Sequence, residues 1–250
     1  MKLSKRLETI VHMASSWALE QESKVRAADV GTDHGFVPIC LIERGIATHA
    51  FALDVGEGPL LRAREHVRER GLTDRIDLRL GDGLTPLARG EADLVIISGM
   101  GGELMLRILK EGSLVRDSIK GWIFSPQSEI AMFRRGLKEL ELSIKEEEMV
   151  QEDGKFYVVM TAEKSSDESP ANADGTDREY EYLYGKRLIE KKDPVLGEFL
   201  KREEKQLATL WEHLKNQEGQ KARERLKEVE KKLEEVRKVE KLFFENLSEE

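Results

Sequence analysis

The sequence predicts an α/β fold, in which a seven-stranded, mostly parallel sheet is followed by a helical coiled-coil hairpin. Three observations predict it. Short apolar stretches that end in small or acidic residues alternate with helix-length stretches, which is typical of parallel strands covered on both faces by helices. Two further extended stretches flank the polar turn at residues 152–155. The residues after 177 carry apolar side chains at heptad-like spacing.

The elements follow in order along the chain. A short leading helix is predicted because Leu3, Leu7, Ile10 and Val11 share one face. Strands are expected at residues 25–30, 50–53, 76–80, 94–98 and 121–125, and helices at 36–44, 58–70, 102–110 and 129–139. Residues 143–148 and 156–160 are expected to close the sheet as a hairpin that supplies an antiparallel strand.

Three regions are predicted: a ligand-binding domain at residues 1–163, a linker at 164–177 and a helical arm at 178–250. The linker has almost no large apolar side chains. Two apolar stripes separated by a polar break predict an antiparallel hairpin in the arm. The stripes are Leu196, Leu200, Leu207, Leu210 and Leu214, then Leu226, Val229, Leu233, Val236 and Phe243.

Composition restricts the possible compartments and ligands. No apolar run is long enough to span a membrane, and the amino terminus lacks the apolar core of a signal peptide. The single cysteine, Cys40, cannot form an internal disulfide and lies in an apolar stretch, so a buried thiol and a cytoplasmic location are expected. Five scattered histidines and one cysteine predict no metal site.

Charge is unevenly distributed along the chain. The net charge is −8, whereas residues 178–250 hold 18 basic and 18 acidic side chains. The whole negative balance therefore belongs to the first 177 residues. Any polyanionic partner would have to meet local basic clusters rather than an overall positive field.

The most informative segment is Ala-Ala-Asp-Val-Gly-Thr-Asp-His-Gly-Phe at residues 27–36. An apolar strand ends at Asp29, and Gly31, Asp33 and Gly35 then alternate. Glycine lets backbone approach a nucleotide-like ligand closely. Asp33 stands where a dinucleotide-binding loop would have its second glycine, and its charge would repel a pyrophosphate but attract a sulfonium. The segment therefore favours S-adenosylmethionine over NAD.

Four loops should meet at the carboxyl edge of the sheet, where doubly wound folds bind their ligands. A carboxylate ending the second strand, Asp54, is placed to hold a ribose, and the third loop offers Asp82. Each aspartate alone is equally consistent with a helix N-cap, and His34 is as consistent with packing as with ligand contact. The predicted cofactor-binding residues are Asp29, Gly31, Asp33, His34, Asp54, Val55, Asp82, Gly83, Gly99 and Met100.

The fourth loop, Ser98-Gly99-Met100-Gly101-Gly102, is informative because of what it lacks. Methyltransferases of exocyclic amines commonly place Asn or Asp before Pro-Pro-aromatic there. This loop instead offers backbone groups and the Met100 thioether as an apolar wall. It suits a ring nitrogen, which has its own lone pair and needs no proton removed.

These residues resemble the bacterial tRNA (adenine-22-N1)-methyltransferases. The resemblance rests on six segments. They are Leu-Ser-Lys-Arg-Leu at 3–7, Ala-Asp-Val-Gly-Thr-Asp-His-Gly-Phe-Val-Pro at 28–38, Ser-Gly-Met-Gly-Gly at 98–102, Ser-Pro-Gln at 125–127, Glu-Asp-Gly-Lys-Phe-Tyr at 152–157, and Tyr-Gly at 184–185 with Lys-Asp-Pro at 192–194. Phe36 stands where the family often has an aromatic with a hydroxyl, so no hydroxyl role carries over. The linker is also longer than the family leads us to expect.

The resemblance implies a Rossmann-like class I methyltransferase that transfers a methyl group from S-adenosylmethionine to N1 of one adenine in tRNA, with the arm helping to hold the RNA. The base would have to be unpaired or flipped, since N1 lies on its pairing edge. The implied catalytic candidates are Asp33, Met100 and Gln127. Asp33 would either stabilise the developing positive charge or only bind the cofactor's amino group.

Further substrate contacts are expected near the strand ends and in local basic pairs. Gln127 and Tyr157 are placed to contact the base, with sheet-end packing as the alternative. The predicted substrate-binding residues are Lys5, Arg6, Gly101, Pro126, Arg134, Arg135 and Tyr157, and Lys186 and Arg187 form a further basic pair. A monomer or weak dimer is expected. Two other functions stay open at this point: a methyltransferase of the same fold acting on a small molecule or protein, and a non-enzymatic cofactor-sensing module with a coiled-coil interaction arm.

Overall fold

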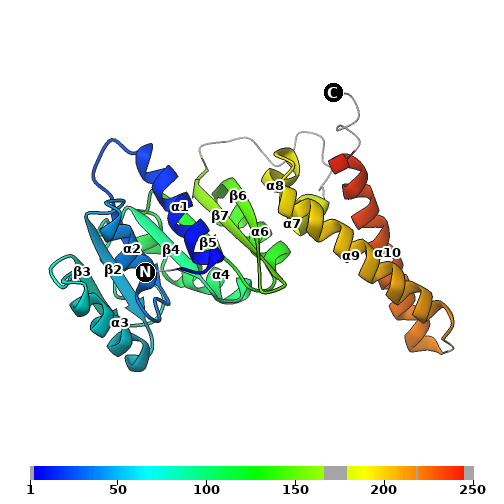
Figure 1. Cartoon of the computed structure of the whole chain (residues 1–250), viewed down its shortest axis with the longest axis horizontal. Coiled ribbons are helices and arrows are strands. Elements are labelled where there is room, and N and C mark those ends of the chain that lie inside the picture. The colour runs from blue at the N-terminus through cyan, green and yellow to red at the C-terminus, as the bar shows by residue number, and fades with distance from the viewer. Residues whose placement is uncertain (1–2, 166–178, 218, 245–250) are drawn as a thin grey trace. The chain divides into compact units, whose positions relative to one another are not determined.

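The computed structural model describes residues 3–165, 179–217 and 219–244 (Figure 1). The chain divides into two compact units, Met1–Thr176 and Asp177–Glu250. The predicted linker lies outside the described residues from position 166 onward, and its first residue, Lys164, ends a strand. No described helix is both long and apolar enough to cross a membrane.

The first unit contains one seven-stranded sheet in the order β3-β2-β1-β4-β5-β7-β6. Strands β1 to β5 pair in parallel, and β7 runs antiparallel to both β5 and β6. The strands are β1 (Arg26–Val30), β2 (His49–Asp54), β3 (Ile76–Leu80), β4 (Leu94–Ser98), β5 (Gly121–Ser125), β6 (Leu142–Glu152) and β7 (Lys155–Lys164). The order reverses between β1 and β4, which is where folds of this kind bind ligands. The predicted fold class is confirmed.

Helices cover both faces of this sheet (Figure 1). They are α1 (Lys5–Leu19), α2 (Phe36–Glu43), α3 (Glu57–Glu69), α4 (Gly102–Glu111), α5 (Ser113–Arg116) and α6 (Ile130–Glu139). Side chains of α1, α2 and α3 share one buried cluster with the sheet, and α4 packs with α6. Along β5, Ile123 joins that cluster, whereas Phe124 meets Phe133 of α6 edge to face at 5.1 Å. This alternation follows from the two-residue period of a strand.

Three elements are longer than the sequence pattern predicted. Helix α1 continues through Met13, Ala14 and Trp17, which are buried. Strands β6 and β7 extend to the turn at Asp153 and Gly154, whose φ values of 49° and 74° suit a two-residue hairpin turn. The charged residues in the middle of β6 obscured its length, because an edge strand tolerates charge that an internal strand does not.

The second unit contains α7 (Glu179–Tyr184), α8 (Lys186–Glu190), α9 (Pro194–Lys215) and α10 (Gln220–Phe244). Asp193 caps the start of α9, since its Oδ1 accepts the backbone N–H groups of Val195 and Leu196. Helices α9 and α10 run antiparallel, since Glu204 pairs with Arg237 while an earlier part of α9 lies against the end of α10. The hairpin prediction is confirmed, but the two short helices before it were not foreseen.

Candidate functional site

The loops after β1 and β2 are joined by backbone hydrogen bonds at the carboxyl edge of the sheet. The N–H groups of Gly31 and Thr32 donate to the carbonyl of Leu53 at 2.9 and 3.0 Å. The carboxylate of Asp54 accepts the N–H of Asp33 at 3.1 Å through Oδ2 and the N–H of Gly56 at 2.9 Å through Oδ1. Asp54 is thus oriented by two main-chain donors, and each of its oxygens keeps further acceptor capacity.

The loop after β3 extends the same edge. The N–H of Gly81 donates to the carbonyl of Asp54 at 3.0 Å. Val55 and Leu80, at the ends of the adjacent strands β2 and β3, are 67% and 54% exposed. Asp82 is exposed beside them and lies 3.5 Å from Arg107 of α4. Two large apolar side chains next to carboxylates make a surface suited to a planar base carrying a ribose.

Asp29 ends up inside the protein although it is charged in solution. The residue is 3% exposed, and burial raises the pKa of its carboxyl from 3.8 to about 7. The nearby Thr32 side chain opposes this rise, and the neighbouring charge of Asp54 adds to it. A buried carboxyl that ionises near neutral pH is typical of a functional site, because a bound cation would offset its desolvation cost.

The loops after β4 and β5 form a second pair of joined loops. Gly99 N–H donates to the Ser125 carbonyl at 3.1 Å, Gln127 N–H to the Met100 carbonyl at 2.9 Å, and Gly102 N–H to the Ser128 carbonyl at 3.0 Å. Gly99 has a φ of 79°, which a residue with a side chain rarely adopts. These bonds hold the glycine-rich loop flat against the following loop.

Met100 connects the two halves of this edge. A methyl group added to Gly31 would lie 2.3 Å from Cε of Met100, so the thioether occupies the space that a side chain at position 31 would fill. Gly31 has a φ of 76°. The predicted cofactor loop and the predicted substrate loop therefore touch through one flexible, polarizable side chain.

A third cluster lies on the far side of the glycine-rich loop. The guanidinium of Arg6, from the first turn of α1, stacks over the Tyr157 ring with Cζ 5.2 Å from the ring centroid. A methyl group on Gly99 would lie 3.7 Å from Nη1 of Arg6 and 3.8 Å from Nε2 of Gln127. The structure thus brings Arg6, Gln127 and Tyr157 to the ends of β4, β5 and β7.

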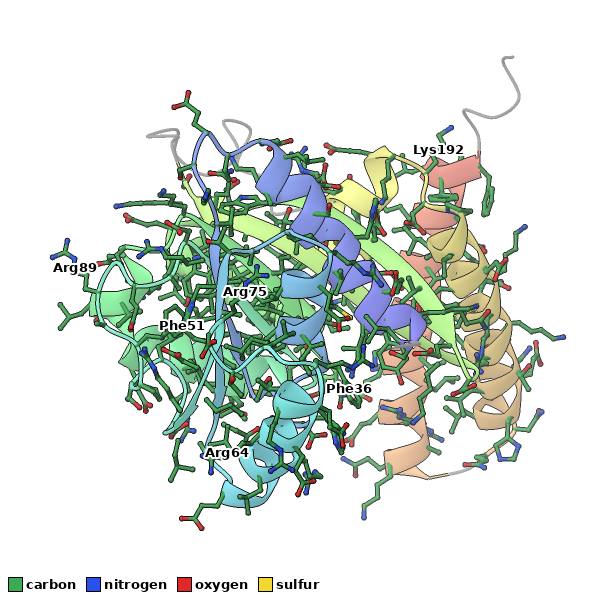
Figure 2. All side chains as sticks on the ribbon, turned by 60° about the vertical axis from the view of Figure 1, so that its left-hand side comes forward. Phe36, Phe51, Arg64, Arg75, Arg89 and Lys192 are labelled. Carbon is green, nitrogen blue, oxygen red and sulfur yellow. The ribbon has the colours of Figure 1, made fainter. Side chains whose placement is uncertain are left out.

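Asp33 and His34 face α3. Asp33 has a φ of 49°, and its carboxylate pairs with Arg62 at 2.8 Å. The His34 ring stacks on Phe36 (labelled in Figure 2) with centroids 5.2 Å apart, and lies 5.8 Å from His66. The structure shows the ring packing of His34, and its predicted cofactor contact and the catalytic role of Asp33 both stay predictions.

Two of the predicted substrate-binding residues, Arg134 and Pro126, are buried. Arg134 is 4% exposed, and its Nε donates to Oε1 of the buried Glu147 at 2.8 Å, so this guanidinium holds α6 against β6. Pro126 is buried. Lys5 is exposed, but its Nζ donates to the Gln151 carbonyl at 3.2 Å. Arg135 is partly buried.

Several residues of this edge were not predicted from the sequence. Arg62 and Arg107 pair with two of the predicted cofactor aspartates, Leu80 adds apolar surface, and Ser128 donates to Glu129. Only Leu80 carried a usable signal, because it ends a strand directly before an acidic turn. Among the described residues, no group of three or more His, Cys, Asp or Glu is arranged to hold a metal ion.

Comparison with known proteins gives the family. A model of the methyltransferase domain matches residues 3–160. The tRNA (adenine(22)-N(1))-methyltransferase of Bacillus subtilis is 30% identical over 243 residues, covering 96% of this chain and 97% of that enzyme. The chain belongs to the tRNA (adenine(22)-N(1))-methyltransferase family.

Solved structures of relatives agree with this. The crystal structure of the Bacillus subtilis enzyme matches with a TM-score of 0.78 at 30% identity, covering 96% of this chain and 99% of that chain. A Streptococcus pneumoniae protein in complex with S-adenosyl-L-methionine matches with a TM-score of 0.79 at 27% identity, covering 96% and 100%. The predictions of a methyltransferase and of S-adenosylmethionine as its cofactor are confirmed.

The residues at this edge fit that cofactor. The buried carboxyl of Asp29 suits a cationic ligand, Asp54 retains acceptors for ribose hydroxyls, and Val55 and Leu80 present apolar surface for a purine. Asp82 lies beside this surface as an acceptor for an amine. The residue-by-residue assignment stays a prediction.

Proposed function

We propose that this methyltransferase transfers the methyl group to N1 of one adenine, adenine 22, in tRNA. The observation that carries the proposal is the contact between the acidic edge at β1 to β3 and the glycine-rich loop at β4, made through Met100 and Gly31. In this proposal the acidic edge is the cofactor half and the glycine-rich loop is the substrate half, and the contact supports placing them side by side. The Bacillus subtilis relative, which acts on this position by its name, supports the choice of substrate.

The chemistry of N1 agrees with the residues present. Bound S-adenosylmethionine supplies an electrophilic methyl group on a positively charged sulfur. N1 of adenine has a free lone pair, so the chain needs no general base. Its task is to hold the base in line and to keep water away, and most of the rate enhancement can come from such positioning.

The substrate half supplies three kinds of contact. Gly99 and Gly101 present backbone without side chains, which lets a planar base lie close to the loop. Met100 forms an apolar wall between base and cofactor loop. The amide of Gln127 is exposed next to Gly99 and is placed to contact the polar edge of a base.

Charge moves from sulfur to the adenine ring during the transfer. The carboxylates at the ends of β1 and β2 form a fixed negative region that favours the cationic cofactor and stabilises the product-like ring. In this proposal Asp29 and Asp54 set that region, because both are held in place by the fold. Asp33 shapes the loop through its N–H bond to Asp54 and contributes its charge together with Arg62.

The remaining features of the proposal concern the whole molecule. The enzyme acts as a monomer or weak dimer in the cytoplasm, where its single cysteine stays reduced and buried. The helical arm helps to hold the RNA. Light scattering on the purified protein, alone and with tRNA, checks the oligomeric state.

Labelled methyl incorporation tests the function directly. Unmodified bulk tRNA, total soluble protein and a small-molecule extract are each incubated with the enzyme and labelled S-adenosylmethionine. The proposal predicts label in tRNA, recovered as 1-methyladenosine. Label in protein or small molecules alone would support the same fold acting on another substrate, and failure to bind the cofactor would favour a non-enzymatic module.

The variant Asp54→Ala is the matched negative control, because it removes the proposed ribose acceptor. It should weaken cofactor binding by about 1.5–3 kcal/mol, as for a hydrogen bond to a charged group. An unchanged cofactor dissociation constant would show that the end of β2 does not hold the ribose.

A further inference from the structure

Arg6 lies in the first turn of α1, outside the predicted cofactor-binding loops. Its helix turn is fixed in two ways: Oγ of Ser4 accepts the Leu7 N–H at 3.3 Å, and the Lys5 N–H donates to Oε1 of Glu152 at 2.7 Å. The Lys5 ammonium adds a bond to the Gln151 carbonyl at 3.2 Å. These contacts attach the start of α1 to the end of β6 and so define where Arg6 projects.

The guanidinium of Arg6 stacks on an aromatic ring, but one of its nitrogens lacks a hydrogen-bond acceptor. One of its faces rests on Tyr157, with Cζ 5.2 Å from the ring centroid. Its Nη1 is buried and has no hydrogen-bond acceptor among the described residues. A buried donor without an acceptor is unfavourable, so a bound ligand that supplies an acceptor here gains affinity.

The position of Arg6 distinguishes between possible acceptors. The guanidinium rests on Tyr157 of β7 and its Nη1 lies beside Gly99 at the end of β4, whereas the cofactor carboxylates end β1 and β2. With neighbouring strands about 4.8 Å apart, β7 lies roughly 14 Å from β1, and Nη1 borders the glycine-rich loop rather than the carboxylates. Arg6 therefore belongs to the substrate half.

The chemistry of a guanidinium narrows the choice further. Arginine donates only, is always charged, and matches the two oxygens of a phosphate with its planar fork. A cation against the ring that becomes positive at N1 would oppose methyl transfer. The group that it binds is therefore an anionic part of the substrate rather than the base itself.

We infer that Arg6 is a positioning residue that binds a phosphodiester group of the RNA next to the target adenosine. Tyr157 orients it through the cation–π contact, and the RNA phosphate satisfies Nη1. The inference rests on the proposed function and adds to it the anchor that holds the flipped nucleotide in register with the methyl group.

The test measures tRNA binding at a series of salt concentrations with S-adenosylhomocysteine present. It compares the wild type, Arg6→Ala, Arg6→Lys and the control Arg89→Ala. Arg89 is exposed, projects outward in Figure 2, and lies in the segment that leads into the start of β4. Its replacement therefore removes the same charge at the opposite edge of the sheet. Calorimetry with S-adenosylhomocysteine alone, and thermal unfolding, accompany each variant.

One phosphate contact has a defined salt signature. Each contact contributes about 0.7 to 0.9 to the slope of log K against log salt. Arg6→Ala should lower that slope by this amount and weaken tRNA binding by about 10- to 100-fold, with S-adenosylhomocysteine affinity unchanged. Arg6→Lys keeps the charge and should retain the slope with a smaller loss, and Arg89→Ala should change neither quantity.

Two results would overturn the inference. A loss of S-adenosylhomocysteine affinity in Arg6→Ala, with the salt slope intact, would assign the guanidinium to the cofactor's carboxylate. Unchanged slope and affinities in a folded Arg6→Ala protein would reduce the residue to packing. Failure of the proposed function has a separate signature, since it would appear in the wild type as absence of 1-methyladenosine.

Discussion

Replacement of Asp29 by asparagine should stabilise the protein and weaken its cofactor binding at the same time. The fold raises the pKa of this carboxyl from 3.8 to about 7, which corresponds to a cost of about 4 kcal/mol for holding the ionised group at pH 8. Asparagine removes the charge but still needs hydrogen-bond partners, so the expected gain in unfolding free energy is about 2–4 kcal/mol at pH 8.

The gain should depend on pH in a defined direction. The folded protein keeps the Asp29 proton up to about pH 7, whereas the unfolded chain releases it near 3.8. Between these values the folded state binds more protons, so wild-type stability falls as pH rises, and the loss is complete above about 7. The advantage of Asp29→Asn should therefore be about 2.5 kcal/mol smaller at pH 5 than at pH 8, and it should vanish below about pH 4.

Thermal unfolding of both proteins at pH 5 and pH 8 measures this difference. For a protein of this size each kcal/mol shifts the melting temperature by about 2–4 °C, so the advantage should be about 5–10 °C larger at pH 8. Titration should also show weaker binding of S-adenosylmethionine, with less change for S-adenosylhomocysteine, whose sulfur is neutral. An advantage equal at both pH values, or a destabilised variant at pH 8, would refute the account of Asp29.

Three further predictions follow from the geometry. Gly31→Ala and Gly45→Ala both force alanine into a left-handed conformation at about 1–2 kcal/mol, but only position 31 meets Met100, so only Gly31→Ala should also lower cofactor affinity and methyl transfer; equal effects in a transfer assay would contradict the contact. Arg134→Ala should lower the unfolding free energy by about 3–5 kcal/mol, measured by denaturant titration, because it breaks the buried ion pair with Glu147, while the tRNA affinity of the folded fraction stays unchanged. A specific loss of RNA binding would instead support its predicted role as a substrate contact. Deletion of residues 178–250 should weaken tRNA binding in a filter assay with cofactor affinity nearly intact, and normal methylation by the truncated, folded protein would exclude the arm as a clamp.

The strands at the centre of the sheet were predictable because burial on both faces leaves a clear mark on the sequence. β4 and β5, at the centre of the sheet, have the expected bounds, and each is an apolar stretch that ends in a serine. β6 did not follow this pattern, since it lies at the edge and carries a charged middle. The site loops were predictable for the same reason as the central strands, because they follow directly from where those strands end.

The pairing of side chains across the fold was not predictable. Arg134 resembles a surface residue beside Arg135, and only the fold brings the carboxylate of Glu147 against it. Arg6 and Tyr157 are distant in sequence, and their stacking depends on α1 crossing to the end of β7. The hydrophobic pattern of a segment indicates how that one helix or strand is buried. These contacts depend instead on the order of the strands in the sheet.

The central claim is that this enzyme methylates N1 of adenine 22 in tRNA. The most direct measurement incubates two unmodified transcripts of one tRNA, with adenine or guanine at position 22, with enzyme and S-adenosylmethionine, and quantifies 1-methyladenosine by mass spectrometry of nucleosides. The account predicts one 1-methyladenosine in the adenine transcript and none in the guanine transcript. Equal methylation of both, or none in either with cofactor binding intact, would contradict it.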